Sequence, residues 1–165
     1  MKKVRGMNME NTIMLFAPNL ISICIDDRVD GDYKGRLIEP YGAGTQLFFE
    51  TADLLLQMDE LYDRWNYPQK AMRSRSFIRR TETVLPVNIR KGDFHMNMKK
   101  VQESRGKKGT FIVQVQYRQN ATWQGQVVWA EENRKEYFRS ALELLKLIDS
   151  AMGAQEEKES DSSAC

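Results

Sequence analysis

Alternating apolar and polar residues predict strands in both halves of the chain. Leu20–Asp26 reads Leu-Ile-Ser-Ile-Cys-Ile-Asp, the pattern of a half-buried strand. Asp30 and Gly31 follow, and because both tolerate positive φ they predict a hairpin turn. A returning strand is expected at 34–39 and a short third strand at 45–49.

A helix is expected over residues 51–65. Thr51 is expected to cap its first turn, with Phe49 packing on that turn. Pro68 cannot continue a helix, so Asn66-Tyr67-Pro68 is expected to end it. The apolar face has helical spacing and consists of Ala52, Leu55, Met58 and Tyr62, with Leu54, Leu61 and Trp65 beside them.

The second half repeats this order after a predicted hairpin with strands at 83–89 and 94–101. The strand 111–118 is expected to place Phe111, Val113, Val115 and Tyr117 on one face and to leave the opposite face mostly solvated. Residues 123–129 predict another strand, and residues 131–135 predict a turn. A helix capped by Ser140 is then expected to end at Gly153.

A shift of 90 residues aligns the two halves. Ile21, Ile23 and Ile25 align with Phe111, Val113 and Val115, and a one-residue gap later aligns Phe49 with Phe138. Each unit would leave one sheet face and one helix stripe uncovered, so pairing two units would bury both. The alternative is two unrelated hairpin–helix segments that share common patterning.

The predicted fold class is therefore α+β. Two pseudo-repeated hairpin, strand and helix units, with about six to eight strands and two main helices, would form one compact domain. The expected parts are a flexible N-terminus at 1–12, a first unit at 13–68, a basic connector at 69–110, a second unit at 111–152 and a disordered acidic tail at 153–165.

Composition limits the class of protein. The chain of 165 residues has 41% hydrophobic and 29% charged residues, typical of a globular protein with a core. No apolar run reaches the length of a membrane span, and Met1–Arg5 is not followed by a signal-peptide pattern. Cys24 and Cys165 lack metal or disulfide spacing, so we expect reduced thiols, no membrane partner and a cytoplasmic protein.

Charge is strongly segregated along the chain. Residues 66–110 carry 12 Lys and Arg against 3 Asp and Glu, whereas acidic residues predominate on both sides. Arginine guanidinium groups bind phosphate oxygens in a forked geometry. The predicted ligand-binding residues are therefore Arg73, Arg75, Arg79 and Arg80, supported by Lys99, Lys100, Arg105, Lys107 and Lys108. The alternative is a solvated connector.

Aromatic residues of the second unit are further candidates. Trp123 and Arg118 lie near a glutamine-rich segment and could stack on and hydrogen-bond a base. Tyr117 and Trp129 are candidate interface residues, because large aromatic side chains often anchor a partner. Core packing is the alternative for both tryptophans.

Other reactive residues do not form a recognisable site. The acidic turn formed by Asp26, Asp27, Asp30 and Asp32 lacks the ligand spacing of a calcium loop. His95, the only histidine, has no partner residues that would make a zinc site. We therefore expect no metal, no cofactor and no enzymatic activity.

Two sequence patterns resemble known families. The strings Tyr117–Gly125 and Tyr137–Leu145 resemble small uncharacterised bacterial proteins with an RQN-A-[ST]-WQG … FRSxLELL pattern, a resemblance that covers about residues 111–152 and implies no activity. Arg75–Arg79 and Asn120–Gly125 are similar to the cyclic-di-GMP-binding motifs of PilZ domains, with Thr122 in place of the serine or alanine of that pattern.

Three hypotheses follow for function. The first is a non-enzymatic binding or regulatory module whose basic segment engages an anionic partner, with nucleic acid as the candidate. The second is a structural or protein-interaction module that forms a homodimer. The third, implied by the PilZ resemblance, is cyclic-dinucleotide binding.

Overall fold

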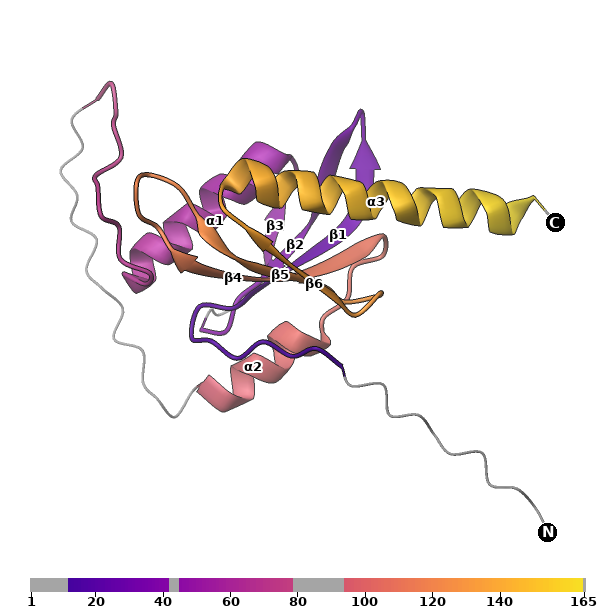
Figure 1. Cartoon of the computed structure of the whole chain (residues 1–165), viewed down its shortest axis with the longest axis horizontal. Coiled ribbons are helices and arrows are strands. Elements are labelled where there is room, and N and C mark those ends of the chain that lie inside the picture. The colour runs from indigo at the N-terminus through magenta and orange to yellow at the C-terminus, as the bar shows by residue number, and fades with distance from the viewer. Residues whose placement is uncertain (1–11, 42–44, 79–93, 165) are drawn as a thin grey trace, which may run out of the picture.

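The computed structural model describes residues 12–41, 45–78 and 94–164. Within these ranges one antiparallel sheet has the strand order β3-β2-β1-β4-β5-β6. Helices α1 and α3 cover one face of the sheet, and α2 lies on the other (Figure 1). The strands are β1 (Ile21–Val29), β2 (Asp32–Ile38), β3 (Gln46–Phe48), β4 (Gly109–Tyr117), β5 (Gln124–Trp129) and β6 (Arg134–Phe138), and the helices are α1 (Thr51–Trp65), α2 (Phe94–Glu103) and α3 (Ala141–Ser163).

The molecule is one compact α+β domain with a core on each face of the sheet. Below α1 and α3, the isoleucines of β1 and the valines of β4 pack against Met58, Leu144 and Ile148. On the other face Leu20, Cys24 and Ile112 pack against Met98 and Val101 of α2. The expectation of a half-buried first strand was wrong, because a second layer covers the face that alternation alone assigns to solvent.

Turn residues correctly predicted the hairpin between β1 and β2. Asp30 and Gly31 have φ values of 53° and 82° between β1 and β2, and Asn120 and Ala121 both have φ of 55° after β4. Asn66, with φ of 49°, ends α1 in the left-handed conformation. Asp30 and Gly31 thus adopt the conformation that their sequence pattern predicted, and α1 ends at the predicted segment.

The two main helices are capped differently. Ser140 caps α3 as predicted, since its hydroxyl accepts a hydrogen bond from the Glu143 amide at 3.1 Å. Thr51 is the first residue of α1 and not its cap. Instead, Asp32 of β2 accepts hydrogen bonds from the Thr51 amide at 2.7 Å and from the Thr51 hydroxyl. The cap comes from a strand 19 residues away, so local sequence could not reveal it.

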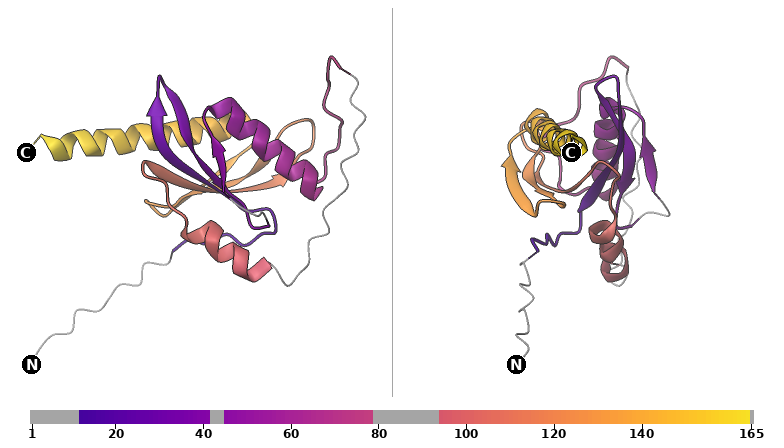
Figure 2. Two further views of the ribbon diagram at one scale, coloured as in Figure 1. Left: turned by 180° about the vertical axis from the view of Figure 1, so that it is seen from behind. Right: turned by 90° about the vertical axis from the view of Figure 1, so that its right-hand side faces the viewer.

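Three further expectations were wrong. Phe94–Glu103 is a helix and not a hairpin strand, and the expected strand at 83–89 lies outside the described residues. The turn expected at 131–135 ends at Asn133, and Arg134–Phe138 is an edge strand that was not expected. α3 continues past Gly153 to Ser163, so the segment expected to be a disordered tail is helical as far as Ser163 (Figure 2).

Strand pairing relates the halves by the same spacing of 90 residues. Ser22 pairs with Ile112, and irregularities fall at Ile25/Asp27 and at Val115/Tyr117. Gly35 pairs with Phe48, and Gly125 pairs with Phe138. Phe48 is buried and Phe49 is 61% exposed, so within the predicted repeat Phe48 would match Phe138 without the expected one-residue gap. The internal repeat itself stays a prediction.

Candidate functional site

The segment that follows α1 is fixed to the end of β4. The peptide between Tyr67 and Pro68 is cis, and Lys70 then forms a bridge with Arg118 just beyond β4. Residues 71–78 continue from this anchored base without regular secondary structure. We call residues 66–78 the basic loop, because Lys70, Arg73 and Arg75 are its charged residues.

Hydrogen bonds from Arg118 fix the base of the basic loop to α1 and to the end of β4. Its side chain is only 3% exposed, although the sequence had placed it on a solvated strand face. Its guanidinium donates to the carbonyl oxygens of Pro68 at 2.7 Å and Tyr62 at 3.1 Å. It also donates to the Asp63 carboxylate at 2.6 Å. The expectation that Arg118 binds a ligand was wrong, because its donors are used inside the fold.

Asp59 and Asp63, one helical turn apart on α1, form ion pairs with both Lys70 and Arg118. Lys70 donates to Asp63 at 2.6 Å and to Asp59 at 3.3 Å, and Arg118 lies 3.5 Å from Asp59. Burial alone would raise the pKa of Asp63, but hydrogen bonds from Lys70 and Arg118 outweigh burial and hold it below its ordinary value. The ionised carboxylate therefore stabilises the attachment of the loop.

An aromatic layer supports this anchor. Trp123 meets the ring of Tyr62 edge-on, with the ring centroids 5.5 Å apart, and Trp65 meets Tyr62 in the same way at 5.9 Å. The Arg118 guanidinium lies 5.7 Å from the centre of the Tyr62 ring. Burial raises the pKa of Tyr62, so its hydroxyl stays protonated. Trp123 thus packs in the scaffold below the loop, which was the alternative to ligand binding.

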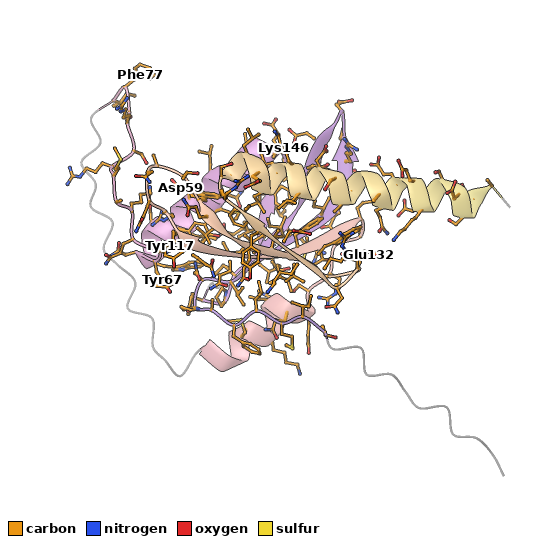
Figure 3. The ribbon with its side chains drawn as sticks, in the orientation of Figure 1. Asp59, Tyr67, Phe77, Tyr117, Glu132 and Lys146 are labelled. Atoms are coloured by element: carbon orange, nitrogen blue, oxygen red, sulfur yellow. The ribbon has the colours of Figure 1, made fainter. Side chains whose placement is uncertain are left out.

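The loop presents cations and apolar side chains to solvent. Arg73 and Arg75 are exposed, and neither has a hydrogen bond or ion pair with any residue in the described parts of the chain. Figure 3 places Phe77 at the tip of the loop and Tyr67 with Tyr117 near its base. The exposed large apolar side chains of this region are Tyr67, Met72, Phe77, Ile78 and Tyr117.

The remaining predicted cations do not extend this surface. Lys99 and Lys100 belong to α2, which lies on the opposite side of the sheet from α1 (Figure 2), and Arg105, Lys107 and Lys108 follow α2 in the chain. Lys99 forms an ion pair with Glu103, and Lys108 lies 3.6 Å from Glu159. Arg79 and Arg80 lie outside the described residues. The cations of the basic segment 66–110 that the structure describes therefore do not form one continuous surface.

The other predicted site residues have structural environments. Trp129 packs against the core with the Lys158 ammonium 5.9 Å from its ring centre. Thr122, in the segment similar to the second PilZ motif, donates from its hydroxyl to the Arg139 carbonyl oxygen next to the hairpin. Asp26 forms a salt bridge with Arg36 at 2.7 Å. No group of three potential metal-ligating side chains occurs in the described part of the chain.

Sequence reasoning missed the ion cluster of Asp59, Asp63, Lys70 and Arg118, in which the arginine is buried and the other three side chains are partly exposed. Asp59 and Asp63 stand four positions apart on α1, a spacing that puts both carboxylates on one helix side and could have indicated a cation partner. The partner itself comes from a strand 55 residues later than Asp63, which no local pattern reveals.

No family model, curated protein or solved structure matches the chain. Among the helices that the structure describes, none is long and apolar enough to cross a membrane. The functional argument therefore depends on the chemistry of the basic loop.

Proposed function

We propose that the chain is a non-enzymatic binding module that uses the basic loop to engage single-stranded nucleic acid. The observation that carries the proposal is the exposure of Arg73 and Arg75 beside the exposed rings of Tyr67, Phe77 and Tyr117. Guanidinium groups bind phosphates, and aromatic rings stack on unpaired bases. Single strands offer both groups at once, whereas a duplex keeps its bases stacked.

The anchored base of the loop supports this function. Arg118 and Lys70 neutralise Asp59 and Asp63, so two carboxylates that would repel a phosphate chain are paired. The loop is also attached to rigid elements at one end, which lowers the entropy lost when a strand binds. The cations that remain for a ligand are Arg73 and Arg75.

Fluorescence anisotropy with a labelled oligothymidine of about 20 nucleotides tests the proposal at several salt concentrations. Replacing Arg73 and Arg75 by glutamine should weaken binding at least about tenfold and reduce the slope of log affinity against log salt by roughly 1 to 2. Phe77→Ala should weaken binding through lost stacking with little change in that slope.

The matched control replaces Lys99 and Lys100 by glutamine. This variant loses the same two positive charges from the opposite side of the sheet, so its binding should be close to that of the wild type. Equal weakening in both double variants would mean that net charge alone attracts the oligonucleotide. That result, or no binding by the wild type at low salt, would overturn the proposal.

A further inference from the structure

A cavity of about 320 Å³ lies between α3 and the last two strands of the sheet. Its lining residues belong to β4, β5, β6 and α3, and α3 crosses β5 and β6 on the side of the sheet that α1 also covers (Figure 1). Its volume falls within the range of small-molecule sites, which are usually apolar with a few polar groups. Its apolar wall consists of Phe111, Val127, Trp129, Leu147, Ala151 and Ala154.

Small side chains on α3 keep this space open. The residues 90 positions before Ala151 and Gln155 are Leu61 and Trp65 of α1, which are 1% and 7% exposed. Trp65 also packs edge-on against Tyr41, with the ring centroids 5.5 Å apart. At these two positions of the predicted repeat, α1 has large buried side chains and α3 has alanine and glutamine.

The mouth of the cavity carries two opposite charges. In the register of β6 against β5, Arg134 lies opposite Trp129 and Glu136 lies opposite Val127, so both side chains are on the cavity face. Both are exposed and both line the cavity. Neither forms an ion pair or a hydrogen bond with a residue in the described ranges. Both charges therefore remain available to a ligand.

We propose that this cavity binds a free α-amino acid with an aromatic or large apolar side chain. Its carboxylate accepts hydrogen bonds from the Arg134 guanidinium, and its ammonium donates to Glu136. Its side chain packs against Trp129 and Leu147 in the space left by Ala151. A ligand with one charge would meet one residue of like charge at the mouth, whereas a zwitterion matches both.

A further cation beside the Trp129 ring does not change the preference for a zwitterionic ligand. Lys158 lies over the Trp129 ring, but its ammonium also forms a 2.5 Å ion pair with Glu132. Ser150 lines the cavity and donates its hydroxyl to the Leu147 carbonyl oxygen. Arg134 and Glu136 are the lining residues whose charges face the mouth without a described partner.

Titration of the ¹⁵N-labelled protein with L-phenylalanine tests the proposal through the indole N–H signal of Trp129. We expect that signal to shift with a Kd on the order of 1 mM, as suits a ligand of this size. Arg134→Gln should weaken binding at least about tenfold. Lys135→Gln removes the same charge from the opposite face of β6 and should leave the affinity unchanged. Ala151→Leu should abolish the shift by filling the cavity.

Two analogues separate recognition of the zwitterion from simple burial of a ring. N-acetyl-L-phenylalanine lacks the ammonium and phenethylamine lacks the carboxylate, so each should bind at least about tenfold more weakly. Equal binding of all three compounds would overturn the proposed ligand class. No shift of the Trp129 signal at about 10 mM L-phenylalanine, L-leucine or L-tryptophan would overturn the site itself. Arg134→Gln changes an exposed residue, so this variant tests the site even if Ala151→Leu fails to fold.

Discussion

Arg28 and Arg118 stand 90 positions apart, and each forms an ion pair with the main helix of the other half. Arg28 lies 3.6 Å from Asp149 of α3, and Arg118 lies 3.5 Å from Asp59 of α1. Their surroundings differ, because the Arg28 side chain is 32% exposed and the Arg118 side chain is 3% exposed. An exposed ion pair contributes little to stability, whereas removing a buried donor leaves buried acceptors without a hydrogen bond.

We therefore predict unequal costs for the same substitution at these two positions. Arg118→Met should lower the free energy of unfolding by about 2–4 kcal/mol, since the carbonyl oxygens of Pro68 and Tyr62 lose their buried donor, whereas Asp63 keeps Lys70 as its partner. Arg28→Met should leave the free energy of unfolding nearly unchanged, because its ion pairs are exposed. Urea unfolding at neutral pH measures both. Equal costs would show that the anchor below the basic loop is no stronger than a surface ion pair.

Glu39 is a buried carboxyl whose pKa is raised, whereas the pKa of Asp63 is lowered. Burial raises its pKa above the ordinary 4.5, although the Tyr41 amide donates to it at 2.6 Å. The folded state therefore holds this proton more tightly than the unfolded chain does. It follows that the free energy of unfolding decreases as pH rises from about 4.5 through the higher pKa of the folded state.

Glu39→Gln should remove this decrease. The variant keeps an oxygen acceptor for the Tyr41 amide and has no charge to bury, so it should be more stable than the wild type at pH 7. The difference should vanish at pH values below 4.5. Thermal unfolding across this pH range measures the effect, with Glu157→Gln on the exposed side of α3 as the control. A Glu39→Gln protein less stable at pH 7 would contradict the argument.

At the scale of elements, the sequence predicted those whose signals are local. Asp30-Gly31, Asn66 and Ser140 act through their own backbone or the next few residues, and the structure has them in the predicted roles. The periodicity of 51–65 predicted a helix for the same reason. These features need no knowledge of the rest of the chain.

Elements that depend on distant residues were missed. α2 covers the second sheet face, and Ile112 is buried only because Met98 and Val101 lie in the same cluster. Asp32 caps α1 and Arg118 anchors the basic loop, each across a long sequence separation. For the candidate site, the sequence nominated Arg73 and Arg75, which are exposed in the structure. It also nominated Arg118 and Trp123, which instead pack in the scaffold that supports the basic loop.

The last turns of α3 combine a helical structure with the composition of a solvated tail. Few apolar side chains hold residues 154–163, and ion pairs from Arg28 to Glu156, Lys108 to Glu159 and Lys158 to Glu132 attach them to the rest of the molecule. All six of these side chains are at least 32% exposed, so each pair contributes little and is screened by salt.

Hydrogen exchange should therefore divide α3 into two parts. Amides at 144–152 should be strongly protected, since Leu144, Ile148 and Met152 are buried in the core. Amides at 156–163 should exchange much faster, and faster still at about 1 M salt, where the Debye length is about 3 Å. Uniform protection along the whole helix would show that the ion pairs are stronger than their exposure implies.

At the scale of the whole molecule, the sheet has two edges that could pair with another chain. β3 is an edge of three residues, which offers little backbone for pairing. β6 is longer, but it places Arg134 and Glu136 on the face that packs against α3. Inward-pointing charges on an edge strand oppose edge-to-edge association, because a partner sheet would have to bury them. This arrangement disfavours a homodimer built through the sheet edge.

Replacing Arg134 and Glu136 together by valine tests that reading. The net charge does not change, but β6 becomes an apolar edge beside the cavity at α3, so the variant should form dimers or larger assemblies. Light scattering over a range of protein concentrations measures the change against a wild type expected to be monomeric. The control replaces Lys135 and Tyr137 by valine on the opposite face of β6, where no charge points toward α3. A wild type that already dimerises through β6, or a valine variant that stays monomeric, would show that these two charges do not protect the edge.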